Sequence, residues 1–123
     1  MKESNDVPPR DILHRISCTL AERKSADPGS SYAASLYARG LDAILKKIAE
    51  EAAETVMAAK DGDRLHVVRE AADLWFHSLI LMQYFGLGVD DILQELHRRE
   101  GISGIDEKKA RMASPAAGAD SKD

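Results

Sequence analysis

The hydrophobic and polar positions of this 123-residue chain alternate with the period of α-helices. Near the N-terminus, Ile12, Ile16 and Leu20 recur at every fourth position, which predicts a short amphipathic helix from Asp11, a plausible N-cap, to about Lys24. The two-residue alternation that is typical of β-strands does not occur along the chain. The pattern therefore predicts an all-α protein.

Two further helices are predicted in the middle of the chain. Ser31 can cap a short helix that extends through Ala38, and Gly40 is well placed to end it. The next helix, residues 41–60, carries one apolar stripe along its length, made of Leu41, Ile44, Leu45, Ile48, Ala52, Val56 and Ala59. The residues Asp61-Gly62-Asp63 then interrupt the helical pattern.

The fourth predicted helix, residues 64–85, is apolar on nearly every side, and Gly86 and Gly88 end it. Such a helix belongs in the centre of a bundle or at a subunit interface. A fifth helix, residues 89–99, is expected to bury Val89, Ile92, Leu93 and Leu96. We therefore expect an antiparallel bundle of about five helices in residues 11–106, with a flexible lead-in at 1–10 and a flexible tail at 107–123.

Composition and charge restrict the possible partners and locations. The net charge of −4 argues against nonspecific binding to nucleic acid. The longest apolar stretch, Leu74–Met82, is far shorter than the ~20 residues that a membrane span requires. The single cysteine, Cys18, cannot form an internal disulfide, which suits a reducing compartment. We expect a cytoplasmic protein that has neither nucleic acid nor a membrane as its partner.

Carboxylates on the third and fourth helices are the strongest chemical signal. At about 100° per residue, Glu51 and Glu54 share one flank with Lys47, and Glu50 lies next to them. The fourth helix has one polar strip on an otherwise apolar surface, made of His66, Glu70, Asp73 and His77. Because a buried charge without a partner costs several kcal/mol, we expect the carboxylates of the two helices to converge on a cation such as Mg²⁺. The alternative is a solvated helix face with surface ion pairs to Lys47 and Arg69.

Several longer motifs resemble those of one enzyme family. They are the stretch Ser31–Lys47, the motif Glu50-Glu51-Ala52-Ala53-Glu54, and the run Glu70-Ala71-Ala72-Asp73-Leu74-Trp75-Phe76-His77. Together they are similar to phosphoribosyl-ATP pyrophosphatase, a branch of the MazG-like all-α nucleotide pyrophosphatases. The resemblance covers about residues 12–111, and Ala49 departs from it at a position where glycine is expected.

The resemblance implies hydrolysis of phosphoribosyl-ATP to phosphoribosyl-AMP and pyrophosphate, an early step of histidine biosynthesis, by a homodimer with interlocked helices. It implies Mg²⁺ as the cofactor, with Glu51, Glu54, Glu70 and Asp73 as ligands. Glu50 is either a further ligand or, like Glu51, a candidate for the catalytic base. Two alternatives keep the helical fold: a housecleaning pyrophosphatase for noncanonical nucleoside triphosphates, and a non-enzymatic protein whose acidic strip pairs with a basic partner.

Other side chains are candidates for contacts with the substrate. Lys46 and Lys47 are the best candidates for phosphate contacts, and Arg39 is a weaker one. Tyr32 could stack on a base or ribose, or could simply pack in the core. His77 could orient a ligand or touch substrate, or be a satisfied core histidine, whereas His66 is expected to be a surface residue.

Overall fold

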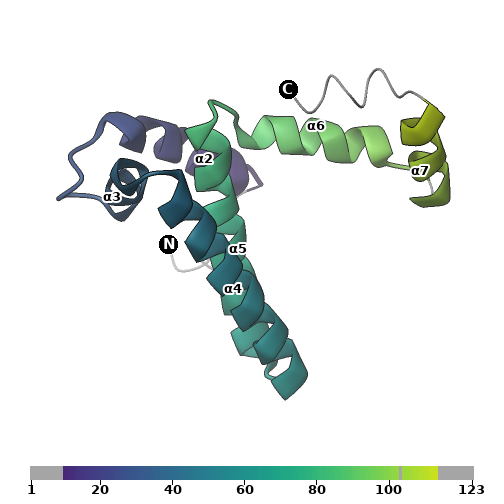
Figure 1. The fold of residues 1–123 in the computed structure, drawn as a ribbon, viewed down its shortest axis with the longest axis horizontal. Coiled ribbons are helices and arrows are strands. Elements are labelled where there is room, and N and C mark those ends of the chain that lie inside the picture. The colour runs from purple at the N-terminus through teal and green to yellow at the C-terminus, as the bar shows by residue number, and fades with distance from the viewer. Residues whose placement is uncertain (1–9, 103, 114–123) are drawn as a thin grey trace. The chain divides into compact units, whose positions relative to one another are not determined.

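A computed structural model describes residues 10–102 and 104–113, and every regular element in these ranges is a helix (Figure 1). In chain order they are α2 (Ile12–Glu22), the 3₁₀-helix η1 (Arg23–Ser25), α3 (Tyr32–Arg39), α4 (Leu41–Asp61), α5 (Arg64–Tyr84), α6 (Val89–Arg99) and α7 (Gly104–Ala113). The all-α class is confirmed, and each of the five predicted helices ends within two residues of the observed one. None of the described helices is both long and apolar enough to span a membrane.

The chain divides into two compact units at Asp90. The first unit holds α2 to α5, and the second holds most of α6 together with α7. The helix α7 was not predicted; it begins in the domain expected at 11–106 and extends into the segment expected as a flexible tail. The lead-in up to residue 9 and the last ten residues, 114–123, lie outside the described residues, so the domain limits stay a prediction.

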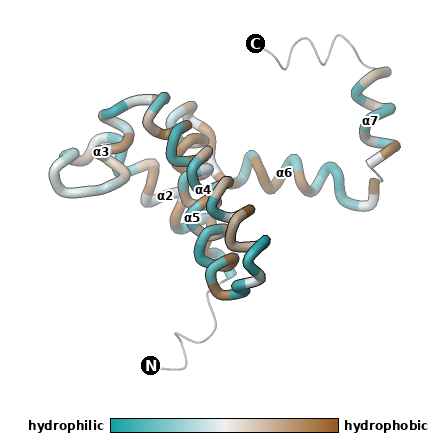
Figure 2. The backbone as a smooth tube through the Cα atoms, turned by 60° about the horizontal axis from the view of Figure 1, so that its bottom comes forward, coloured by the Kyte–Doolittle hydropathy of each residue, from teal (hydrophilic) through white to brown (hydrophobic). Residues whose placement is uncertain are grey.

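The antiparallel pair of α4 and α5 is the centre of the first unit. Gly62 ends α4 with a φ of +75°, a conformation that glycine adopts without steric cost. The carboxylate of Asp63 then caps α5 by accepting a hydrogen bond from the backbone N–H of His66, at 3.1 Å. Because the turn is this short, the two long helices run back along each other, as both views show (Figures 1 and 2).

The helices α2 and α3 pack against this pair around a small core. Leu36, Ile44 and Ile80 are fully buried there. The hydroxyl of Ser17 on α2 accepts hydrogen bonds from the backbone N–H of Val89, at 3.1 Å, and from the side-chain amide of Gln83, at 3.2 Å. These bonds tie α2 to the chain that follows α5, so the N-terminal helix has a defined position on the pair.

The apolar stripe predicted on α4 is partly exposed in the single chain, and the burial expected on α6 is wrong for two residues. On α4, Leu45 and Val56 of the predicted apolar stripe are exposed, because the side of α4 that packs inward is centred on Ile44, Glu51 and Ala58. On α6, Leu93 and Leu96 are also exposed, and only Val89 is buried. Apolar side chains therefore remain uncovered on the outside of the fold.

Candidate metal and nucleotide site

Three carboxylates from the two long helices meet in the first unit. Oxygen atoms of Glu51 on α4 and of Glu70 and Asp73 on α5 all lie within 4.8 Å of one another. Glu51 is only 6% exposed, although it is charged at neutral pH in an ordinary environment. Since the polar strip of α5 and the inner side of α4 are the faces that pack together, the convergence predicted from the sequence is observed for these three residues.

Two oxygens of this cluster lack any hydrogen-bond donor. The Oε1 atoms of Glu51 and Glu70 are buried and accept no hydrogen bond from the described residues. A buried acceptor without a donor costs free energy comparable to a lost hydrogen bond, and more when it is charged. A divalent cation would relieve this cost, because Mg²⁺ binds carboxylate oxygens and keeps several of its own waters. The cluster therefore fits the cation that the sequence predicts.

The pKa values of the cluster show the same strain. Burial, followed by the neighbouring carboxylates of Glu70, Asp73 and Glu54, raises the pKa of Glu51 from 4.5 to about 7. The pKa of Glu54 is also raised, mainly by Glu70. The pKa of Glu70 is lowered, mainly by Glu54 and further by Glu51 and His66. Glu54 thus interacts closely with the cluster, although it is exposed and lies outside the three that converge most tightly.

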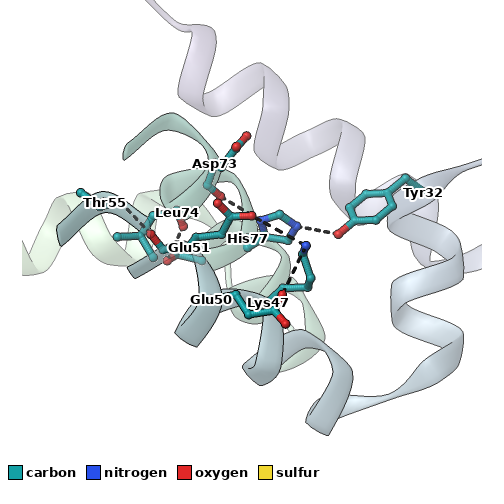
Figure 3. A network of polar contacts seen from close by, with 9 residues as sticks. Tyr32, Lys47, Glu50, Glu51, Thr55, Asp73, Leu74 and His77 are labelled. Carbon is teal, nitrogen blue, oxygen red and sulfur yellow. Dashed lines mark hydrogen bonds and ion pairs between the residues drawn. The ribbon is translucent and has the colours of Figure 1, made fainter. Parts of the chain in front are cut away.

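Lys47 lies at the edge of the cluster and connects it to Glu50. Its Nζ atom is 3.8 Å from Oε2 of Glu51 and 3.6 Å from Oε1 of Glu50 (Figure 3). Glu50 is exposed and does not belong to the three converging carboxylates. The two neighbouring glutamates therefore differ: Glu51 faces the carboxylates of α5, and Glu50 pairs with the lysine.

A buried histidine links the cluster to a tyrosine on α3. Nδ1 of His77 is 2.9 Å from the backbone oxygen of Asp73, and because a carbonyl can only accept, Nδ1 carries a proton and donates it. Nε2 lies 2.7 Å from the hydroxyl of Tyr32, which donates to it when the ring carries its proton on Nδ1 alone (Figure 3). The same Nδ1 lies 4.0 Å from Oε2 of Glu51. The tyrosine is thereby held in a fixed orientation next to the carboxylates.

Of the remaining polar residues, His66 contacts the cluster, whereas Lys46 and Arg39 do not. His66, expected to be a surface residue, has its Nε2 atom 3.0 Å from Oε2 of Glu70, a contact that its i,i+4 spacing could have indicated. Lys46 and Arg39 are exposed and make no hydrogen bond or ion pair through their side chains with any residue in the described ranges. Their role in phosphate binding stays a prediction.

Comparison with known proteins now identifies the family. The family model described as phosphoribosyl-ATP pyrophosphohydrolase matches residues 13–100, which include every carboxylate of the cluster. The chain belongs to this family. It is 69% identical over 104 residues to the phosphoribosyl-ATP pyrophosphatase of Aromatoleum aromaticum, covering 85% of this chain and 96% of that protein.

Other members of the phosphoribosyl-ATP pyrophosphohydrolase family are similar over nearly their whole length. The phosphoribosyl-ATP pyrophosphatase of an Azoarcus species is 68% identical over 101 residues, which cover 82% of this chain and 94% of that protein. The protein of the same name from Neisseria gonorrhoeae is 52% identical over 103 residues, 84% of this chain and 96% of that protein. The resemblance stated from the sequence motifs is confirmed.

Proposed function

We propose that the chain hydrolyses phosphoribosyl-ATP to phosphoribosyl-AMP and pyrophosphate, a step of histidine biosynthesis, and that it requires Mg²⁺. The observation that carries the proposal is the cluster of Glu51, Glu70 and Asp73, whose oxygens lie within 4.8 Å of one another in a chain of the phosphoribosyl-ATP pyrophosphohydrolase family. The similar proteins of Aromatoleum aromaticum, Azoarcus and Neisseria gonorrhoeae carry this substrate in their names.

The metal would be held by Glu51, Glu70 and Asp73, with Glu54 as a further ligand. When bound, Mg²⁺ neutralises phosphate charge and acidifies a coordinated water. The buried, donorless oxygens of Glu51 and Glu70 support this ligand set, because they have no other partner in the described part of the chain.

The phosphate groups would meet the cations beside the cluster. Lys47 is close enough to Glu51 to contact a phosphate at the metal site, and Lys46 and Arg39 would add positive charge around it. In the reaction a water adds to phosphorus, the bond to the bridging oxygen between the α and β phosphorus atoms breaks, and a carboxylate takes the proton of the water. Glu50 and Glu51 are the candidates for this base.

Tyr32 and His77 would form the wall on the nucleoside side. The hydrogen bond between them fixes the tyrosine ring, which is 49% exposed and free to stack on a base or ribose. His77 is only 5% exposed, so its proposed role is to position Tyr32 and not to contact the substrate over a large area.

The test is a pyrophosphate-release assay with phosphoribosyl-ATP beside a panel of ordinary and modified nucleoside triphosphates, each with Mg²⁺ and with EDTA. We expect phosphoribosyl-ATP to have the highest kcat/KM and EDTA to abolish turnover. Preference for a modified triphosphate would instead assign the chain to housecleaning hydrolysis, and full activity in EDTA would remove the metal from the proposal.

A homodimer is the proposed assembly. Large apolar side chains on the α4–α5 pair are exposed in the single chain, each by about 60% or more: Val56, Met57, Leu65, Val68 and Trp75. An uncovered apolar surface of this kind marks an interaction site, and a second copy of the chain would bury it. The cytoplasmic location expected from the single Cys18 stays a prediction.

A further inference from the structure

A cavity lies between α2, the start of α3 and α5. Its volume is about 360 Å³, within the range of roughly 300–1,000 Å³ that is typical of small-molecule sites. The apolar part of its lining includes Ile12, Ile16, Tyr32 and Phe76, and the polar part includes Arg15, Thr19 and Arg23. The proposed chemistry at the carboxylates uses none of the residues that α2 contributes.

Two arginines give the cavity a positive charge. Arg15 and Arg23 are eight residues apart, so with Thr19 between them they lie on one side of α2 and its 3₁₀ extension. Neither arginine side chain forms an ion pair or a hydrogen bond with another residue in the ranges that the structure describes. A guanidinium group presents several N–H donors in one plane, an arrangement that matches the oxygens of a phosphate. The cavity therefore combines an apolar lining with two arginines that have no ion-pair partner among the described residues.

Tyr32 connects the lining of the cavity to the carboxylate site. This residue lines the cavity, and its hydroxyl is bonded to His77, whose Nδ1 lies 4.0 Å from Glu51 (Figure 3). Phe76 also lines the cavity, and its ring packs edge-to-face on His77 with centroids 5.5 Å apart. Tyr32 and Phe76 thus each contact the cavity on one side and His77, next to the carboxylates, on the other.

Phosphoribosyl-ATP has a part that fits such a cavity. It differs from ATP by a ribose that carries its own phosphate, at the end of the molecule away from the triphosphate. We propose that Arg15 and Arg23 bind this phosphate and that Tyr32 and Phe76 contact the sugar and the purine. The inference rests on the proposed function, and it makes α2 the element that distinguishes phosphoribosyl-ATP from ATP and other nucleoside triphosphates.

The test compares two inhibitors that share an adenosine phosphate but differ in the phosphoribosyl group. Phosphoribosyl-AMP and AMP are titrated against hydrolysis of phosphoribosyl-ATP by the wild-type chain and by Arg15→Ala, Arg23→Ala and the double variant. We expect each single variant to raise the KM for phosphoribosyl-ATP and the Ki of phosphoribosyl-AMP by roughly tenfold, with kcat changed little. The Ki of AMP should stay within about a factor of two of the wild-type value.

The controls separate charge, folding and the proposed function. Arg64→Ala removes an exposed arginine at the start of α5 that does not line the cavity, and it should change neither Ki. Arg23→Lys should recover part of the lost affinity, because the charge remains while the planar donor arrangement is lost. Equal increases in the Ki of AMP and phosphoribosyl-AMP, or no increase in either, would overturn the inference while leaving the proposed function intact. A wild-type chain without activity on phosphoribosyl-ATP would overturn both.

Discussion

Replacing Glu51 by glutamine should change the stability of the protein in opposite directions with and without Mg²⁺. Glu51 is the most buried carboxylate of the cluster, and its pKa in the folded chain is about 7 against an ordinary value of 4.5. A raised pKa means that folding favours the protonated form. This contribution to stability is fully present below pH 4.5 and is lost as the pH rises through 7.

The size of the effect follows from the difference between the two pKa values. At roughly 1.36 kcal/mol for each pKa unit, the ionised carboxyl destabilises the metal-free fold at pH 8 by about 3 kcal/mol. Solvent screening of the exposed members of the cluster reduces this to about 1–2 kcal/mol. Glutamine has nearly the same shape and no charge, so Glu51→Gln should stabilise the metal-free protein by that amount. At roughly 4 °C per kcal/mol, the Tm rises by about 4–8 °C.

In Mg²⁺, the wild-type protein should be more stable than Glu51→Gln. A ligand at a hundred times its Kd stabilises the native state by about 2.7 kcal/mol, and the variant loses most of this gain because it lacks a central ligand. The assay is thermal unfolding followed by circular dichroism at pH 5 and pH 8, each in EDTA and in excess Mg²⁺. Glu22→Gln, at an exposed glutamate of α2, is the matched control and should behave as wild type. The reasoning fails if Glu51→Gln lowers the Tm in EDTA at pH 8, or if its effect is the same at both pH values.

Three further predictions test the metal site, the histidine–tyrosine contact and the interface. Asp73→Asn should reduce kcat/KM by at least tenfold and raise the Mg²⁺ concentration needed for half-maximal activity. Both are measured by pyrophosphate release in a Mg²⁺ titration, and an unchanged titration would exclude Asp73 as a ligand. Tyr32→Phe removes the donor to Nε2 of the buried His77, so the free energy of unfolding in urea should fall by about 1–3 kcal/mol, and no loss would mean that water replaces the hydroxyl. Trp75→Glu introduces a charge into the exposed apolar face of α5, so sedimentation velocity should show a monomer for this variant and dimers for the wild type and Trp75→Phe. A dimeric Trp75→Glu would show that the interface does not include this face.

The helices could be predicted from the sequence because their signals are local. The period of the apolar residues, the cap at Ser31 and the break at Asp61-Gly62-Asp63 each act within a few residues, and the observed helices follow them closely. The helix α7 was missed because it has no strong apolar face and follows a glycine-rich connection. The sequence pattern predicted the apolar faces of α4 and α6, but it could not indicate that parts of these faces remain exposed in a single chain.

The pairing of the carboxylates was also largely determined by the sequence. Glu70 and Asp73 lie on the one polar strip of their helix, and the short turn after α4 brings Glu51 of α4 against that strip. Spacing alone could not separate Glu50 from Glu51, because adjacent residues differ by only about 100° around a helix. Tertiary packing separates them by turning Glu51 inward and leaving Glu50 with Lys47.

Contacts between distant parts of the chain were decided only by the tertiary structure. The bond from Tyr32 to His77 joins residues 45 apart, and the arginine-lined cavity combines α2 with Phe76 of α5. No local pattern encodes such a juxtaposition, because it depends on how the helices cross rather than on where each one begins or ends. The sequence by itself thus determined the five helices up to residue 99, the family and the acidic motifs. The fold decided which of the acids lie together and which arginines line a cavity without an anion among the described residues.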